Sequence, residues 1–498
     1  MKTRQTGVAS AVAAVALLLG GATGVRAEDG AAVRPAATGV PRVLTWRVTP
    51  RPEALLLYRC AGAAPLVFAP DAVTGAIRFL ACPGDVALLA CKRTHPVQGQ
   101  EKADAQSEQE EGQFLLFVDA ADGGELALTL DPDWAFVRQD GHPIGLLVEP
   151  SGGTCLSAAA LPLRLAALTA EDLRAFRLLI LESGAAEGNA DAGAEAGEAA
   201  LQRAFAQRLG EARPPRLTVC IQGEKDPGPA LASLDPVSLF YGDHAPAGML
   251  PGLAGKRVEN LLVTGGLGAA DLAALAKLPR LRNLQIWGQD KAEPPLQLPD
   301  GLAIEALGVG GEAAGVGGLA QQKGLVRLAA PAEELASLDL RATFPRLASL
   351  STAVSKLPTV PAGLRHLGFI QDTGVTVELL AKVVKANPDL VAIEFMNCNE
   401  LTDLSALKGL PGLESLLFVR TPVADTKTLA ELKGTRFIAL PAKDFFEGEG
   451  SEALKELKAR RPEATIVPVD ALCLGSGWIV LLLPVMAVGA LLARRGLR

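Results

Sequence analysis

Residues 401–444 decide the fold, because they form two successive lines of 22 residues with the same apolar pattern. The first line reads LTDLSALKGLPGLESLLFVRTP and the second reads VADTKTLAELKGTRFIALPAKD. Alignment of the two lines places Leu416 over Ile438 and Phe418 over Leu440. A fixed period of about 20–30 residues predicts a solenoid, in which each unit buries its apolar face against its neighbours.

The core of this pattern is an apolar triplet at positions i, i+3 and i+5, which recurs nine times in steps of 17 to 26 residues. The triplets are Val258/Leu261/Val263, Leu281/Leu284/Ile286, Ile304/Leu307/Val309, Leu325/Leu328/Ala330, Leu347/Leu350/Thr352, Leu364/Leu367/Phe369, Leu390/Ile393/Phe395, Leu413/Leu416/Phe418 and Thr435/Ile438/Leu440. Two weaker units begin at Arg216 and Val237. Each triplet fits a short strand with its turn, so the pattern predicts a solenoid over residues 216–469.

This pattern resembles the leucine-rich-repeat superfamily. Leu390–Asp403, with the sequence LVAIEFMNCNELTD, is similar to its cysteine-containing repeat, and Ser355–Phe369 is similar to the short bacterial LPxxPxGL form. The resemblance implies an α/β solenoid with parallel strands on its concave face, and it makes Cys398 a small buried residue. The helical spacing of residues 375–388 predicts a helix on the convex side.

The resemblance also implies a ligand surface, because the superfamily usually binds through the variable positions between the triplet leucines. Here those positions hold Arg282, Asn283, Gln285, Trp287, Arg327, Arg365, His366, Glu394, Asn397, Glu414, Arg420 and Arg436. Trp and Arg are typical anchors of protein interfaces, so a protein partner is expected. The alternative is a solvated face without a partner.

Residues 28–166 read as a separate all-β domain, either a sandwich or a small barrel. Eight short apolar runs alternate with turn signals such as PGD and DGG. Within this domain, the polar stretch 98–113 predicts a mobile loop, with an acidic recognition loop as the alternative. A helical connector is expected over 167–215, with a low-complexity linker at 183–200, although Phe176, Leu179 and Leu181 also fit an early repeat strand.

No pattern of residues predicts catalysis. The four histidines are scattered, and no HExxH, CxxC or EF-hand loop occurs, so no catalytic residue, metal or cofactor is expected. Seven cysteines are present, and Cys82 and Cys91 flank a Pro-Gly turn at the ends of adjacent predicted strands. They are a candidate disulfide, with buried reduced thiols as the alternative.

The two ends of the chain predict export and anchoring. Residues 1–27 have the basic start, apolar stretch and small residues of a signal peptide, with an uncleaved anchor as the alternative. Residues 471–493 carry no charge and predict a transmembrane helix, followed by a basic cytoplasmic tail at 494–498. This end also resembles CTERM-type sorting anchors. The expected location is therefore the cell membrane, with the body of the protein outside the cytoplasm.

The charge balance excludes nucleic acid as the expected partner. The chain carries 48 basic and 55 acidic residues, and six of the basic residues lie in the acid-free ends. An acidic body repels a phosphate backbone. The sequence thus predicts a non-enzymatic, membrane-anchored binding or scaffold protein. The alternatives are an enzyme-like β domain with a substrate-recruiting solenoid, and a structural envelope protein.

Overall fold

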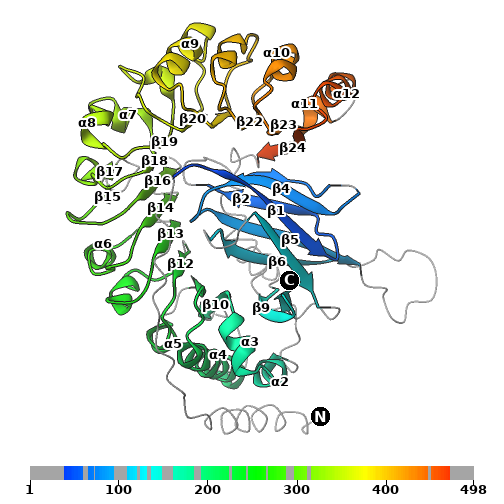
Figure 1. Ribbon diagram of the computed structural model, residues 1–498. Helices are drawn as coiled ribbons and strands as arrows, with labels where there is room; N and C mark the ends of the chain where they lie inside the picture. The colour runs from blue at the N-terminus through cyan, green and yellow to red at the C-terminus, as the bar shows by residue number, and fades with distance from the viewer. Residues whose placement is uncertain are drawn as a thin grey trace, which may run out of the picture.

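The protein is an arch of parallel strands whose hollow is filled by a smaller β structure (Figure 1). The computed structural model describes residues 39–59, 65–71, 73–94, 109–119, 124–131, 136–147, 161–183, 192–223, 227–242, 245–264, 267–287, 296–310, 316–446 and 450–471. The predicted signal peptide and most of the predicted loop at 98–113 lie outside these ranges. We call residues 39–147 the β module and residues 178–471 the arch.

The arch is built from one strand per repeat. These strands are β10 (Leu178–Ser183), β11 (Thr218–Gly223), β12 (Ser238–Tyr241), β13 (Asn260–Thr264), β14 (Asn283–Trp287), β16 (Ala306–Gly310), β18 (Arg327–Ala329), β19 (Ser349–Thr352), β20 (His366–Ile370), β21 (Ala392–Met396), β22 (Ser415–Val419), β23 (Phe437–Pro441) and β24 (Thr465–Ala471). Each pairs in parallel with the next. A small parallel pair, β15 (Leu296–Gln297) and β17 (Val316–Gly317), lies on one of the loops.

The repeat register aligns the triplet residues in rows that run through the arch. Leu416 lies beside Ile393 on one side and Ile438 on the other, and all three are buried. The Phe395 ring stacks between Phe369 and Phe418, with centroid distances of 5.0 and 5.2 Å. The rows form one continuous apolar core, because no single repeat has enough surface to bury its own triplet.

Short helices and turns cover the convex side. The helices there are η2 (Leu250–Leu253), α5 (Gly228–Ser233), α6 (Ala269–Leu275), η3 (Leu319–Gln321), α7 (Ala332–Leu335), α8 (Leu340–Thr343), η4 (Val354–Lys356), α9 (Val377–Ala386), η5 (Ser405–Gly409), α10 (Thr426–Glu431), α11 (Ala442–Phe445) and α12 (Gly450–Arg460). The expectation of an α/β solenoid is wrong, because the fold is mostly strands and these convex helices are short. Repeats of 21 to 23 residues leave room for at most about two helical turns, as in α6. The 26-residue step holds the ten-residue helix α9, which Thr376 caps.

The β module consists of two sheets around a shared core. Its strands are β1 (Arg42–Thr49), β2 (Ala54–Tyr58), β3 (Leu66–Phe68), β4 (Ala76–Ala81), β5 (Val86–Thr94), β6 (Gln109–Phe117), β7 (Glu125–Leu130), β8 (Phe136–Gln139) and β9 (His142–Leu146). One sheet has the order β4-β1-β7-β8-β9, and the other contains β3, β2, β5 and β6. Trp46, Phe68 and Phe79 pack between the sheets.

The β module is not the separate domain that the sequence predicts. Strand β24, at the end of the arch, pairs antiparallel with β3, so a single 17-stranded sheet runs around the arch and into the module. At the other end of the arch, the Arg177 backbone N–H donates to the carbonyl of Ile144 in β9, the edge strand of the five-stranded sheet of the module. Covering β24 removes an open strand edge, which repeat proteins otherwise have to protect.

The connector differs from its expectation in two places. Strand β10 follows α2 (Leu161–Ala166) and α3 (Ala170–Ala175), and it confirms the alternative of an early repeat strand. Helix α4 (Ala192–Ala212) begins inside the stretch predicted as a linker. At the other side of the module, β6 takes in residues 109–113 of the predicted mobile loop.

The predicted membrane helix is not supported. Among the residues that the structure describes, no helix combines the length and apolar character needed to cross a bilayer, and residues 472–498 lie outside the described ranges. The expected C-terminal membrane helix, and the membrane location derived from it, are therefore withdrawn.

Candidate functional site

The concave face of the arch is covered by the β module. In each repeat strand the triplet residues point into the arch, and the residues between them face the hollow. Half of the predicted binding residues lie on this face and are buried: Asn283, Gln285, Trp287, Arg327, His366 and Glu394. The structure therefore places the centre of the expected ligand surface against another part of the same chain.

Apolar contacts join the two parts into one core. Phe79 and Phe114 of the β module belong to the same buried cluster as Trp287, Leu417 and Phe437 of the concave face. The Trp287 ring meets Tyr58 edge-on, with 5.8 Å between centroids. An apolar interface that is continuous with the core of the β module favours a fixed arrangement over a hinged one.

A turn of the β module approaches the concave face closely at β14. The turn is Pro83-Gly84-Asp85, and the Gly84 carbonyl accepts a hydrogen bond from Gln285. A Cβ atom at Gly84, whose φ is +89°, would lie only 2.8 Å from the Asn283 side chain. Glycine is thus required twice, by the backbone angle and by the close approach.

Buried charges complete this contact, and we call them the junction cluster: Arg59, Asp85, Arg327, His366, Glu394 and Ser349. Arg59 follows β2 and donates to the Glu394 carboxylate on β21. Asp85 lies 3.5 Å from Arg59 and accepts from Arg327 at 2.7 Å. His366 lies 3.2 Å from Glu394 and 2.7 Å from the Ser349 hydroxyl.

The junction cluster is balanced in charge, with two arginines and two carboxylates. Burial opposes ionisation of Glu394, but Arg59 and His366 outweigh it and bring the pKa of Glu394 to about 2. Burial lowers the pKa of His366, and the nearby Glu394 offsets only part of that effect. At neutral pH the carboxylate is therefore charged and the imidazole is neutral.

The junction predicts that acid destabilises the protein. Because the pKa of His366 is lower in the folded chain than in the unfolded chain, the unfolded chain binds more protons below about pH 6.5. We expect the free energy of unfolding to fall by up to about 1.4 kcal/mol per pH unit as the pH drops below that value. Urea titrations at several pH values measure the slope.

His366→Gln should make this acid slope shallower, because the amide does not titrate. His142→Gln is the matched control, since His142 lies at the surface beside Asp172. Equal slopes in the wild type and His366→Gln would contradict the assignment.

Four of the predicted residues remain exposed, and all four occupy the position directly before a repeat strand. They are Arg282, Arg365, Glu414 and Arg436. Backbone hydrogen bonds of 2.8 Å link Arg365, Val391, Glu414 and Arg436 in sequence across the repeats. We call this line of positions the strand-start rim.

The remaining two residues, Asn397 and Arg420, lie just after β21 and β22 and are partly exposed. Both have positive φ angles, 52° and 47°, as does Gln371 at the same place one repeat earlier. The recurrence of this backbone conformation shows that the repeat turn imposes it. They belong to the opposite, strand-end side of the sheet.

The register decides what kind of solenoid this is. Leu367, Ile393, Leu416 and Ile438 align in adjacent parallel strands, one per repeat. Cys398 is buried in its turn, where burial raises the pKa of its thiol to about 11. The arch therefore has the repeat architecture of a leucine-rich-repeat solenoid.

Three bacterial proteins of solved structure are among those that match part of this chain. An internalin (inlF) of Listeria monocytogenes shares 15% identity over 57% of this chain and 87% of its own, with a TM-score of 0.27. A Leptospira interrogans leucine-rich-repeat protein shares 12% over 59% and 90%, also at 0.27. Internalin C2 of Listeria monocytogenes shares 15% over 54% and 83%, at 0.16. These scores are too low to support an argument about function.

No family model and no curated protein sequence matches this chain.

Ser349, His366 and Glu394 have the residue types of a hydrolytic triad, but their surroundings do not suit one. Their exposed fractions are 0%, 1% and 2%, and Glu394 is already bound by Arg59. A nucleophile needs room for a substrate beside it. We therefore assign these side chains to the contact between arch and module. The described residues also contain no group of three or more metal-ligating side chains suited to an ion.

The candidate disulfide is absent, since Cys82 and Cys91 are both buried and do not form a disulfide bond. Cys82 follows β4 in one sheet of the module, whereas Cys91 lies within β5 in the other. The intervening turn carries the chain from sheet to sheet and does not close a hairpin, which separates the two sulfur atoms. Burial raises the pKa of the Cys82 thiol to about 11, so it stays protonated.

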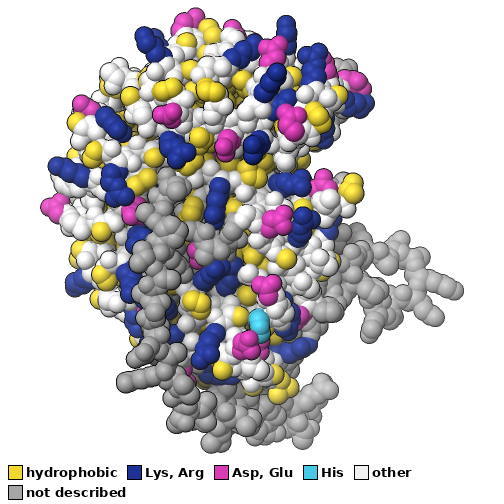
Figure 2. Space-filling model, viewed as in Figure 1, with side chains coloured by type: hydrophobic (Ala, Val, Ile, Leu, Met, Phe, Trp, Pro, Cys, Tyr) yellow, Lys and Arg dark blue, Asp and Glu magenta, His cyan; other side chains and the backbone are white. Residues whose placement is uncertain are grey.

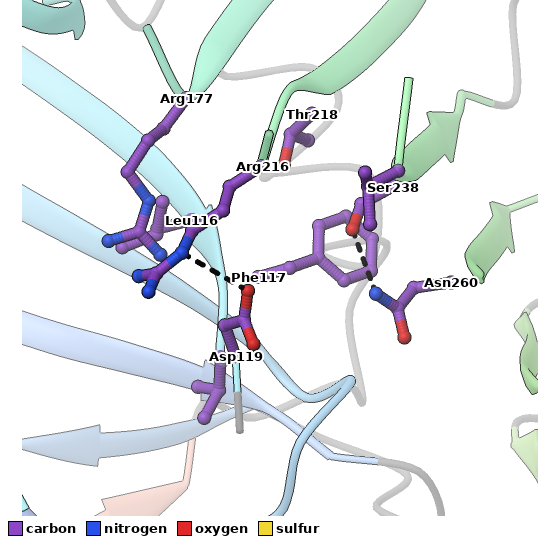
Figure 3. Close-up of a pocket in the computed structure, with 10 residues that line it drawn as sticks. Leu116, Phe117, Asp119, Arg177, Arg216, Thr218, Ser238 and Asn260 are labelled. Carbon is purple, nitrogen blue, oxygen red and sulfur yellow. Dashed lines mark hydrogen bonds and ion pairs between the residues drawn. The ribbon is translucent and has the colours of Figure 1, made fainter. Parts of the chain in front are cut away.

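A second meeting point of module and arch lies at the end of β6 (Figure 3). Arg216 approaches Asp119 at 3.6 Å, and Asn260 donates to Ser238 at 2.9 Å. The cavity that these residues line has a volume of about 10 Å³, which is room for one water molecule. It is a polar seam of the contact and too small for a ligand.

Sequence reasoning missed Arg59 and Asp85, which hold the junction from the module side. The one available signal was a charged residue directly after the apolar run ALLLY. A charge next to a buried strand requires a partner, but the sequence does not identify that partner.

Proposed function

We propose that this protein is a non-enzymatic, protein-binding scaffold whose concave face holds its own β module. The observation that carries the proposal is the contact of Arg59, from the module, with Glu394, a predicted ligand-binding residue of the concave face. The surface that leucine-rich repeats ordinarily offer to a partner is here matched to a folded β structure of the same chain.

Three properties of the contact indicate that the concave face binds the β module and does not merely lie near it. It has a buried aromatic anchor in Trp287, a continuous apolar core, and charges that are paired across it. Tight protein interfaces combine the same features. An external partner would then meet the outer surfaces of the arch, of which the strand-start rim is one.

The test is a cut between the two parts. A specific protease site inserted within residues 148–160, between Leu147 and Leu161, allows the folded chain to be cleaved there. We expect the two pieces to elute together from a sizing column at micromolar concentration, because the concave face holds the module without the covalent link.

Urea provides the control, since it should separate the cleaved pieces and dilution should restore the complex. Trp287→Ala in the same cleavable chain should weaken the association, because the side chain fills the centre of the contact. Pieces that separate in native buffer would contradict the proposal.

A further inference from the structure

Four charged side chains lie on four consecutive repeats at the C-terminal half of the strand-start rim. Three of them occupy rim positions, and Asp389 lies two residues before the rim position Val391. They are Arg365, Asp389, Glu414 and Arg436, all exposed. In chain order their signs are positive, negative, negative and positive. A groove with a volume of about 560 Å³ runs beside Arg365 and Asp389, and it is lined also by Gly363, Pro388, Val391, Pro411 and Gly412.

These four side chains have no hydrogen bond or ion pair of their own among the described parts of the chain. Some exposed charges on the convex side are paired. There, Lys408 pairs with Glu431 at 2.5 Å and Lys455 pairs with Glu452 at 2.6 Å. The rim charges are therefore available to another molecule without breaking an existing contact.

The backbone beneath the charges is rigid, because each rim residue is hydrogen-bonded to the next repeat. Neighbouring strands are about 4.8 Å apart, so Arg365 and Arg436 are separated by about 14 Å along the rim. In an extended peptide, side chains at i, i+2 and i+4 share one face and span a similar length, since the rise is about 3.4 Å per residue. A rigid site of this kind loses little entropy when it binds.

The order of positive and negative charges along the rim determines which kind of molecule fits it. We propose that this rim binds an extended segment of another protein with the pattern acidic-x-basic-x-acidic. The two acidic side chains face Arg365 and Arg436, and the basic side chain faces Asp389 and Glu414. The proposal rests on the proposed protein-binding function, and it names the chemistry of the external partner.

A polyanion suits the rim poorly, because Asp389 and Glu414 lie between the two arginines. The wider surface agrees, since Lys, Arg, Asp and Glu are interspersed on the face shown in Figure 2. At the N-terminal side the charged row is interrupted, because the backbone at Gly39 packs against Val326 and a Cβ there would lie 2.7 Å from it. The site is thus confined to the repeats from β20 to β23.

The experiment uses the full chain and synthetic peptides of the pattern Glu-x-Lys-x-Glu, with varied uncharged residues at x and a fluorescent label. The inverse pattern, Lys-x-Glu-x-Lys, is the peptide control. We expect saturable binding of the first set, measured by fluorescence anisotropy, and no binding of the second. Added salt should weaken the binding, because the contacts are exposed charge pairs.

The variant Arg365→Glu with Arg436→Glu should lose about tenfold or more in affinity, because two attractive contacts become repulsive. Lys408→Glu with Lys455→Glu, on the convex side, is the matched control and should bind as the wild type does.

Failure of every Glu-x-Lys-x-Glu peptide to bind would overturn the inference, as would equal binding of both patterns or an unaltered affinity in the Arg365/Arg436 variant. The cleavage experiment above is independent of these peptides. Co-elution of the cleaved pieces without peptide binding would leave the proposed function standing and remove only the rim site.

Discussion

Arg59→Ala is expected to lower the free energy of unfolding by about 3–5 kcal/mol, because it leaves buried carboxylates without their partner. Glu394 loses its contact with the guanidinium, and Asp85 keeps only Arg327. Neither carboxylate is accessible to water, with exposed fractions of 2% and 0%. Urea denaturation followed by circular dichroism measures the loss.

The matched control is Arg47→Ala on β1. Arg47 pairs with Glu125 at 3.6 Å, but both side chains are at least half exposed, so the cost should stay below about 1 kcal/mol. If the two alanine variants lost the same stability, the junction cluster would not be the buried contact described above. A further variant, Arg59→Met with Glu394→Gln, should recover part of the loss, since it removes the unpaired charge as well as its partner.

The repeat half of the fold was predictable because its signal is local and repeated. Each triplet places its apolar residues on one side of a short strand, and the register of Leu416 with Ile438 follows directly from the 22-residue step. The convex helix α9 was equally readable, since its helical stripe is encoded in adjacent residues.

The occupation of the concave face was not predictable, because it depends on shape and on partners distant in sequence. Arg59 and Glu394 are 335 residues apart, and nothing near either one indicates the other. Small residues such as Gly308 and Gly368 on the concave face looked like a bland surface in the sequence. In the structure, they lie on the concave face, opposite the β module.

The β module also divides the candidate binding residues into a buried group and an exposed group. The repeat pattern indicates that Trp287 and Arg365 are variable positions, but it does not indicate which of them is covered by another segment of the chain. The structure buries Trp287 under the module and leaves Arg365 on the rim. The two residues that the sequence treated as one surface therefore require separate experiments.

Leu416→Asp is expected to have the largest effect of any substitution considered, and to unfold both the arch and the β module. Leu416 is 0% exposed and lies between Ile393 and Ile438. Loss of a buried leucine costs about 2–5 kcal/mol, and an unpaired buried carboxylate adds to this. The sum is comparable to the entire stability of a typical protein, about 5–15 kcal/mol.

The module should unfold with the arch because the two share a sheet at β24 and β3 and share a core at Trp287. Tryptophan fluorescence, to which Trp46 of the module and Trp287 of the arch contribute together with Trp134 and Trp478, should then change together with the circular dichroism signal of the arch. Thr402→Asp, at an exposed position of the same repeat, is the control and should leave both signals unchanged. A Leu416→Asp protein that lost the arch signal but kept a cooperative fluorescence transition would show that the module folds alone, contrary to the shared core.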